Sequence, residues 1–227
     1  FLQDVILRQS PQSRFSAQII NKFRISAIAA STALLFACSS QEIAPLPLGV
    51  SLVETVTAQQ DILNIPFKKY KLANGLTVIL HQDNSDPLVH VDVTYHVGSA
   101  REQLGKSGFA HFFEHMMFQG SQNVADERHF KIINDAGGNM NGNTTSDRTV
   151  YFQTIPSNYL ETALWLESDR MGFLLDAVTD EKFENQRDAV KNEKYQNQIS
   201  QQYGMRNEIL GQSLYPPSHP YNWPVIG

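Results

Sequence analysis

The chain has 227 residues, of which 41% are hydrophobic, and a formal net charge of −5. The hydrophobic fraction is large enough to build a core, which excludes a wholly disordered chain. A single cysteine excludes a framework of intramolecular disulfides. The acidic balance argues against a protein that works by neutralising phosphates. No apolar run reaches the ~20 residues that span a bilayer as a helix.

The first 38 residues are expected to consist of some upstream residues, about 1–19, followed by the pattern of an export signal. A basic stretch with Lys22 and Arg24 is followed by the apolar run Ile25–Ala37 and then by Cys38. This order is typical of a secretory signal, and Leu-Phe-Ala-Cys at its end resembles a bacterial lipobox, in which the cysteine is lipidated. The alternative is an ordinary helix with an apolar cysteine. On the signal interpretation, Cys38 anchors an exported, periplasmic protein, and the lack of Asp after it favours the outer membrane of a Gram-negative bacterium.

Three segments are expected along the chain. After the leader at 1–38, residues 39–63 are expected to form a flexible tether, because Pro45 and Pro47 disfavour regular structure. Residues 64–227 are expected to form a globular domain. Since the chain begins without an initiator methionine and ends abruptly, we expect a piece of a longer protein, truncated on the C-terminal side of this domain.

The domain begins with three predicted strands. Phe67–Leu72 and Leu76–His81 flank an Asn-Gly pair at 74–75, which is a strong hairpin signal. Leu88–Val97, rich in β-branched residues, is the third strand. A fourth, Thr149–Ile155, ends at a proline.

The remaining periodic segments predict helices. Ser157 is the expected N-cap of the predicted helix that has the longest apolar stripe. Thr179 precedes a predicted helix with two acidic residues in its first turn. Strands followed by blocks of helices indicate an α+β fold. The predicted helices are Phe109–Phe118, Asp126–Ala136, Ser157–Leu175 with Leu160, Leu164, Met171 and Leu175 in its stripe, Thr179–Gln202, and Arg206–Leu214.

The segment His-Phe-Phe-Glu-His at 111–115 carries the most chemical information. On a helix, His111 and His115 are one turn apart and share a face, so both imidazoles can reach one Zn²⁺. Glu114 points near that face, where a carboxylate can take a proton from a water held by the metal. Two histidines and a glutamate can share a helix by chance. Their phenylalanine- and methionine-rich surroundings make three ionisable groups costly unless they are paired or metal-bound.

A catalytic zinc needs a third protein ligand, which residue types alone do not identify. His129, at the start of a predicted helix, is expected to be a surface or cap residue rather than a ligand. The other histidines, in strands or among prolines, are His81, His90, His96 and His219. The better candidates are carboxylates on the 180–202 helix, namely Glu181, Glu184 and Glu193.

Ordered blocks over about residues 65–227 resemble the pitrilysin/insulinase family of zinc peptidases. The histidine motif lies at their centre. The blocks are Gly98–Glu102, Gly108–Met116 with Phe118 and Gly120, Gly137–Thr144, Asp147–Thr149, Tyr151-Phe152, Glu167–Met171, Arg187–Glu193, His219–Tyr221 and Trp223-Pro224.

The resemblance implies a role for each matching residue. His111 and His115 correspond to zinc ligands, Glu114 to the general base and Glu193 to the distal glutamate ligand. One departure is that Gln186 stands where the family often has a second glutamate, so a charge near the metal is missing while ligation is expected to survive.

The resemblance also implies a substrate-binding mode. Asn141 and Gly142 match the edge-strand segment beside which the family lays the substrate main chain, a β-augmentation that explains loose sequence preference. The implied fold is an antiparallel-rich sheet covered by helices. Family members pair two homologous halves around a chamber, in one chain or two subunits, so this chain alone is expected to cleave peptides poorly.

The expected function is therefore a zinc-dependent endopeptidase, with one Zn²⁺ in the catalytic domain and Glu114 activating the attacking water. Chamber enclosure favours oligopeptides or unfolded segments as substrates, and no nucleic-acid partner is expected. The alternatives are a non-catalytic partner half or peptide-binding module and, less favoured, a different zinc hydrolase on a similar fold. Because partner halves usually lose part of the metal motif, the intact motif favours the enzyme.

Overall fold

The structure, a computed structural model, describes residues 45–59 and 64–227. The chain forms two compact units that divide between Asp83 and Asn84. The export signal expected at 1–38, including Cys38, lies outside the described residues, and it stays a prediction. Across the two described stretches, no helix has the length and apolarity needed to cross a membrane.

The first unit contains a three-stranded antiparallel sheet in the order β1-β2-β3. Its strands are β1 (Val50–Val56), β2 (Phe67–Leu72) and β3 (Thr77–Leu80). The β2–β3 hairpin turns where the Asn-Gly pair predicts: Gly75 has φ +90°, and the Leu76 N–H donates to Asn74 Oδ1 at 3.0 Å. The first two strands of the domain are thus confirmed.

Strand β1 falls inside 39–63, and the expectation of a flexible tether is wrong for this segment. Val50 to Val56 pair with Leu72 to Phe67 along β2. The segment is rich in valine and threonine, which favour strands, and the edge of β2 supplies the hydrogen bonds that stabilise it. The two prolines lie just before the strand rather than within it.

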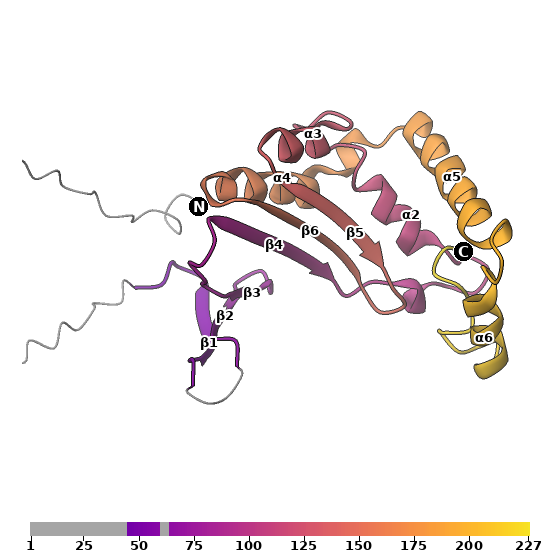
Figure 1. The fold of residues 1–227 in the computed structure, drawn as a ribbon, viewed down its shortest axis with the longest axis horizontal. Coiled ribbons are helices and arrows are strands. Elements are labelled where there is room, and N and C mark those ends of the chain that lie inside the picture. Colours follow the sequence, from indigo (N-terminus) through magenta and orange to yellow (C-terminus); the bar gives the residue numbers. More distant parts are fainter. Residues whose placement is uncertain (1–44, 60–63) are drawn as a thin grey trace, which may run out of the picture. The chain divides into compact units, whose positions relative to one another are not determined.

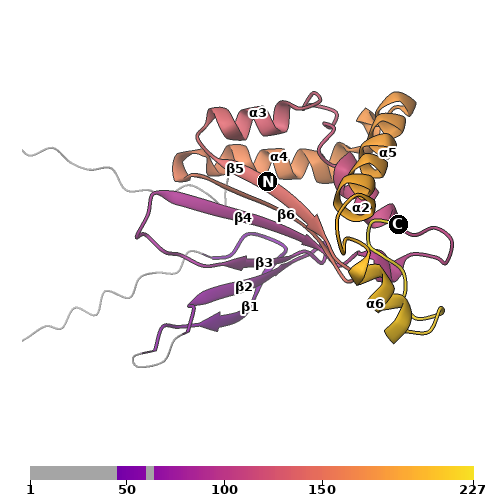
Figure 2. The same cartoon turned by 45° about the vertical axis from the view of Figure 1, so that its right-hand side comes forward.

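The second unit contains an antiparallel sheet in the order β4-β6-β5 (Figure 2). The central strand β6 (Thr149–Pro156) pairs with β4 (Leu88–Tyr95) on one side and with β5 (Asn139–Thr144) on the other. Among the described strands β5 has one neighbour, so one of its edges carries free N–H and C=O groups.

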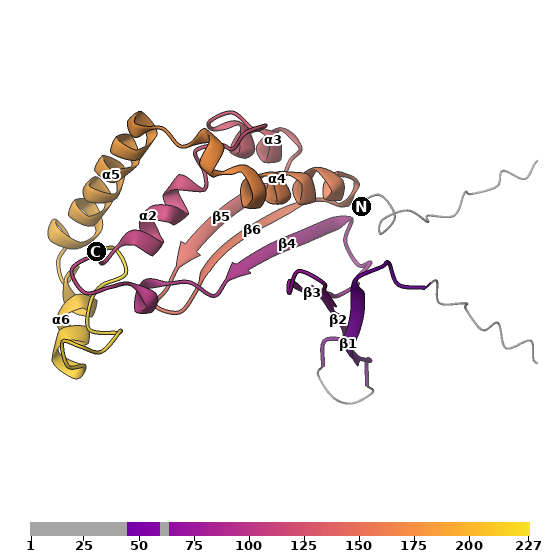
Figure 3. The same cartoon turned by 180° about the vertical axis from the view of Figure 1, so that it is seen from behind.

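Helices α3 (Arg128–Asp135) and α4 (Leu160–Phe173) cover one face of this sheet (Figures 1 and 3). Strands pairing in antiparallel sheets with helices packed on them confirm the α+β prediction. Three short 3₁₀ turns, Ser99–Arg101, Ser157–Tyr159 and Leu175–Ala177, join the longer elements. The helices are α2 (Phe109–Met116), α3 (Arg128–Asp135), α4 (Leu160–Phe173), α5 (Asp180–Lys194) and α6 (Arg206–Leu214), with one π-helical turn at Tyr195–Ile199.

The hydrophobic core lies between the sheet and these two helices. Ile133 of α3, Ile155 of β6, and Ala163 and Leu166 of α4 are all fully buried. Burial of each large aliphatic side chain stabilises the fold by about 1.5–3 kcal/mol. The core therefore fixes the β5–β6 hairpin against the helices, and with it the position of the free edge.

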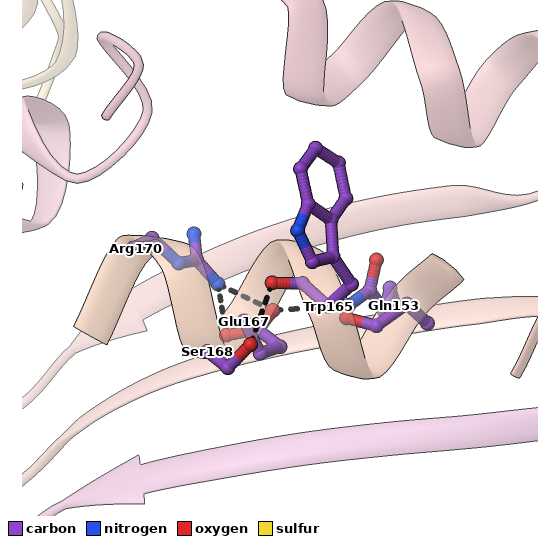
Figure 4. A network of polar contacts seen from close by, with 6 residues as sticks. Gln153, Trp165, Glu167, Ser168 and Arg170 are labelled. Atoms are coloured by element: carbon purple, nitrogen blue, oxygen red, sulfur yellow. Dashed lines mark hydrogen bonds and ion pairs between the residues drawn. The ribbon is translucent and has the colours of Figure 1, made fainter. Parts of the chain in front are cut away.

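Helix α4 differs from its predicted pattern. Ser157 begins a 3₁₀ turn and caps no helix with its side chain, and Met171 and Leu175 of the expected stripe are exposed. The buried face instead includes Glu167 and Arg170, which pair with each other (Figure 4). An apolar stripe could not reveal this face, because two charges can be buried together when each satisfies the other.

Candidate metal centre

Helix α2, which carries the histidine motif, has a carboxylate at its N-terminus. Glu102 accepts hydrogen bonds from the Gly108 N–H at 2.9 Å and from the Ala110 N–H at 2.7 Å. Two of the amides that the first turn leaves unpaired are therefore satisfied, and a negative charge there also suits the helix dipole. This cap fixes where the motif helix begins.

Helix α5 lies beside α2 and brings the distal part of the site to it (Figure 1). Thr179 caps α5 by accepting from the Lys182 N–H, as predicted, and the Phe112 and Phe183 rings meet at 4.7 Å between the two helices. Glu193 then lies in the last turn of α5, opposite the histidines. The helix ends at Lys194, several residues earlier than expected, where the π-helical turn begins.

The predicted metal ligands come together at one point. Glu193 Oε2 lies 3.2 Å from His115 Nε2 and 3.6 Å from His111 Nε2. One ligand atom from each of the three residues lies within 4.8 Å of the others. Two imidazoles and one carboxylate form a donor set typical of catalytic zinc sites, which leave a fourth position open. The residues present therefore fit a zinc ion.

The surroundings of each imidazole bear on how it would bind a cation. Burial lowers the pKa of His111 below its usual value, which favours the neutral ring. His115 Nδ1 lies 3.3 Å from the side-chain oxygen of Gln186. Since that oxygen can only accept, Nδ1 is the nitrogen that donates to it, and Nε2 of a neutral ring is the atom left to bind a metal. A neutral amide here orients the ligand where the family often has a carboxylate.

Glu114 is buried, at 8% exposure, and is held by the hairpin rather than by the metal ligands. Its Oε2 accepts a hydrogen bond from Thr144 Oγ1 at 2.6 Å. A Cβ atom placed on Gly142 would lie 3.2 Å from Glu114 Oε1 and 3.1 Å from the Phe118 ring. Only a residue without a side chain leaves this space free, so the main chain of β5 closely approaches the carboxylate.

The free edge of β5 runs past this carboxylate. The Thr145 N–H donates to Arg148 O at 2.8 Å and closes the hairpin, and Gly142 lies opposite Tyr151. Hydrogen-bonded pairs alternate along an antiparallel ladder, so Gly142 is in a non-bonded pair and its N–H and C=O point away from β6. That N–H is taken by Asn141 Oδ1 at 2.8 Å.

The remaining candidates lie elsewhere. Glu184 pairs with Arg187, and Glu181 lies in the first turn of α5, far along the helix from Glu193. The other histidines contact Pro66, Thr154, Arg101 and Tyr215, and none joins the metal group found among the described residues; they are His81, His90, His96 and His219, in that order.

His129 does not join the metal group found among the described residues, and the expectation of a surface or cap position is wrong. Its side chain is buried, at 3% exposure, on α3. Burial, followed by the nearby charge of Arg170, lowers the pKa of His129 to about 3, so the ring is neutral. The burial of His129 is a result of tertiary packing, because the residues after α2 place the face of α3 that carries His129 against the sheet.

Sequence reasoning missed Thr144 and the role of Glu102. An acidic residue shortly before a predicted helix is a recognisable cap signal, so Glu102 could have been found. Thr144 carries no such signal, because its contact with Glu114 spans 30 residues and arises only when the hairpin packs on α2.

The model of the insulinase family, peptidase family M16, matches residues 77–217. The chain belongs to this family. Its relatives include a zinc protease of Helicobacter pylori, PqqE, which is 34% identical over 69% of this chain and 35% of that protein. Human insulin-degrading enzyme is 28% identical over 43% of this chain and 10% of its own length. The name of the Helicobacter relative, a zinc protease, agrees with the donor set of two imidazoles and one carboxylate described above.

Solved structures of the family have the same fold. The crystal structure of a protease from Helicobacter pylori has a TM-score of 0.68 and 32% identity, covering 72% of this chain and 39% of that one. Pitrilysin has a TM-score of 0.67 at 24% identity, covering 79% of this chain and 19% of its own. The chain spans about a third of the length of the Helicobacter relative.

Proposed function

We propose that this protein is a zinc-dependent endopeptidase in which Glu114 activates the attacking water. The observation that carries the proposal is the convergence of three ligand atoms, from His111, His115 and Glu193, beside the buried Glu114 and the free edge of β5. The names of relatives as zinc proteases support zinc as the cofactor.

Zinc bound at this point supplies a Lewis acid that polarises a peptide carbonyl and acidifies water. Side chains of this protein carry out the proton transfers and hold the reacting groups in place. Glu114 accepts a proton from the attacking water and delivers it to the departing amine. The Thr144 hydroxyl holds one oxygen of Glu114, which leaves the other, Oε1, facing Gly142 and the reaction.

The free edge of β5 supports a main-chain mode of substrate binding. The N–H and C=O of Gly142 can pair with an extended peptide added as a fourth strand, next to Glu114. Extended segments are available in oligopeptides and unfolded chains and are scarce in folded proteins, so we propose these as substrates. Asn141, whose Oδ1 now accepts from Gly142, would release that N–H to the substrate.

The same proposal covers the rest of the protein. A second homologous half, on the same chain or another subunit, completes the substrate chamber, so the 227-residue chain alone cleaves poorly. Export and lipidation at Cys38, with attachment to the outer membrane, rest on the signal-like pattern before it. Metabolic labelling with a fatty acid tests this: label must enter the wild-type protein and be lost in Cys38→Ser, and label in neither contradicts it.

The deciding experiment is Glu114→Gln in the natural protein. Peptidase activity is expected to fall by about 10²–10⁴-fold, because the proton acceptor is lost, while zinc content stays the same. Glu181→Gln, an exposed change on α5, is the matched control and should retain activity. If Glu114→Gln cleaves peptides as fast as the wild type, the mechanism is wrong. Peptide binding without cleavage by the wild type would instead favour the alternative of a binding module.

A further inference from the structure

Helix α4 buries a cation close to the proposed active site. Arg170 and Glu167 are only 2% exposed, and Arg170 Nη2 donates to both oxygens of Glu167 at 2.5 and 2.6 Å (Figure 4). Gln153 of β6 donates to the same glutamate at 3.0 Å. The ion pair is thus closed on itself, and neither charge reaches solvent.

The guanidinium group is also placed over aromatic rings. Its central carbon lies 4.2 Å from the centroid of the Tyr151 ring and 5.5 Å from that of Phe118. These two rings meet edge to face at 5.6 Å. A cation over a ring face is attracted by the π-electrons, and the attraction is stronger where water is excluded. Arg170 therefore holds both rings in a defined orientation.

The two rings lead directly to the residues of the site. Tyr151 lies opposite Gly142 in the β5–β6 ladder. The Phe118 ring and Glu114 Oε1 are the nearest neighbours of the space where a Cβ of Gly142 would lie. Contacts thus run from Arg170 through one layer of aromatic rings to the edge strand and the proposed base.

A purely stabilising role does not explain this arrangement. A buried ion pair adds little net stability over apolar residues of similar volume, because removing both charges from water is costly. Two further nitrogens of Arg170, Nε and Nη1, are buried without a partner among the described residues, which adds to that cost. What the planar guanidinium supplies, and an apolar side chain does not, is a fixed orientation of the rings beneath it.

We propose that Arg170 is a positioning residue, which acts through Phe118 and Tyr151 to hold Gly142 at the correct separation from Glu114. On the proposed function, this separation sets how the scissile bond of a peptide on β5 meets the base. Small displacements of reacting groups cost large factors in rate, while the main-chain hydrogen bonds that bind the peptide persist. Arg170 should thus affect kcat much more than KM.

The test compares two variants of the natural protein in its zinc form. Glu167→Gln with Arg170→Met removes both charges, and the new amide oxygen still accepts from Gln153. Its melting temperature is expected to stay close to that of the wild type, while kcat falls about tenfold and KM changes less than about twofold. The matched control is Glu184→Gln with Arg187→Met, which removes an exposed i,i+3 pair on α5 and should leave kcat unchanged.

A second variant covers the possibility that the first does not fold. Arg170→Lys retains the charge and the pairing with Glu167 but lacks the planar group, so kcat is again expected to fall several-fold. If either variant folds and has the same kcat as the wild type, the proposal is wrong. The proposal is also overturned if the control variant, Glu184→Gln with Arg187→Met, shows a rise in KM and a fall in kcat of equal size. That result would show a general effect of removing ion pairs.

The effect of Arg170 on turnover rests on the proposed peptidase function, whereas its effect on geometry does not. Crystal structures of the wild type and Arg170→Lys provide the independent measurement. We expect the Phe118 ring to rotate and Gly142 to move relative to Glu114. If both residues keep their positions, Arg170 does not position them, even if the natural protein hydrolyses no peptide. If they move and no peptide is cleaved by the wild type, only the peptidase function fails.

Discussion

Two groups of charged side chains in the second unit differ in how their charges are balanced. In the metal centre, lone pairs of His111, His115 and Glu193 converge on one point, and the side chains are 12%, 26% and 34% exposed. In the pair on α4, Glu167 and Arg170 are almost fully buried and satisfy each other. One group directs its ligand atoms at a single point, whereas the two charges of the other group pair with each other.

This difference separates a binding site from an architectural one. Ligand atoms that converge on one point can all bind the same metal ion. The charges of Glu167 and Arg170 are already paired with each other, and the influence of this pair on chemistry passes through the side chains that it touches. Removing one member should therefore cost metal affinity in the first group and geometry in the second.

The largest effect is expected from breaking the metal centre. His111→Ala removes one of the three proposed ligands, and zinc affinity should fall by more than about 100-fold, beyond the loss expected for residues that only support a ligand. Zinc titration measures this effect.

His90→Ala is the matched control for this change. His90 lies on β4 and contacts Thr154, outside the metal group, so its loss should leave zinc affinity as it is. If both variants bind zinc equally well, His111 is not a ligand.

A smaller effect is expected from Gln186, which touches the metal centre without belonging to it. Gln186→Leu removes the acceptor from His115 Nδ1, and zinc affinity should fall by about 10- to 100-fold. Gln186→Glu restores an acceptor and adds a charge, so its affinity should equal or exceed that of the wild type. Competition with a zinc chelator ranks the three proteins. Wild-type affinity in the leucine variant would show that the contact with His115 does not orient the ring.

The smallest effect concerns His129, which lies beside the pair on α4. Its pKa is about 3 in the folded protein and near 6.5 when unfolded, so the unfolded chain binds more protons between these values. Its contribution to stability is complete above pH 6.5 and is lost as the pH falls toward 3, with a slope approaching about 1.4 kcal/mol per pH unit. Urea unfolding of His129→Gln should show a flatter pH dependence across this window.

His219→Gln provides the comparison, since that ring is only half-buried, beside Tyr215 and Tyr221. An identical pH slope in wild type and His129→Gln would mean that His129 becomes protonated in the folded state. The environment of Arg170 would then be less closed than the structure indicates.

The motif helix could be predicted well because its chemistry is local. His111, Glu114 and His115 lie within two turns of one helix, and helical spacing alone brings both imidazoles to one face. Glu193 could not be chosen from residue types, since three carboxylates on one predicted helix were equivalent until the resemblance was considered. Its contact with the histidines requires α5 to lie beside α2, and no local pattern encodes that placement.

The errors have a common physical cause. Strand β1 depends on the edge of β2, the buried face of α4 depends on Glu167 and Arg170 satisfying each other, and the burial of His129 depends on how α3 meets the sheet. In each case a contact between residues far apart in the chain, which the local pattern does not reveal, decided the outcome.

The sequence by itself determined the α+β class, the hairpin at Asn74-Gly75, the histidine pair with its glutamate, and, through resemblance, the peptidase family. These features depend on residues close in the chain or on ordered motifs. The tertiary structure alone decided that Glu114 is held by Thr144, that Gly142 leaves room beside it, and that a buried arginine lies behind both through one layer of aromatic rings. Such contacts join residues tens of positions apart, so they exist only once the core has packed.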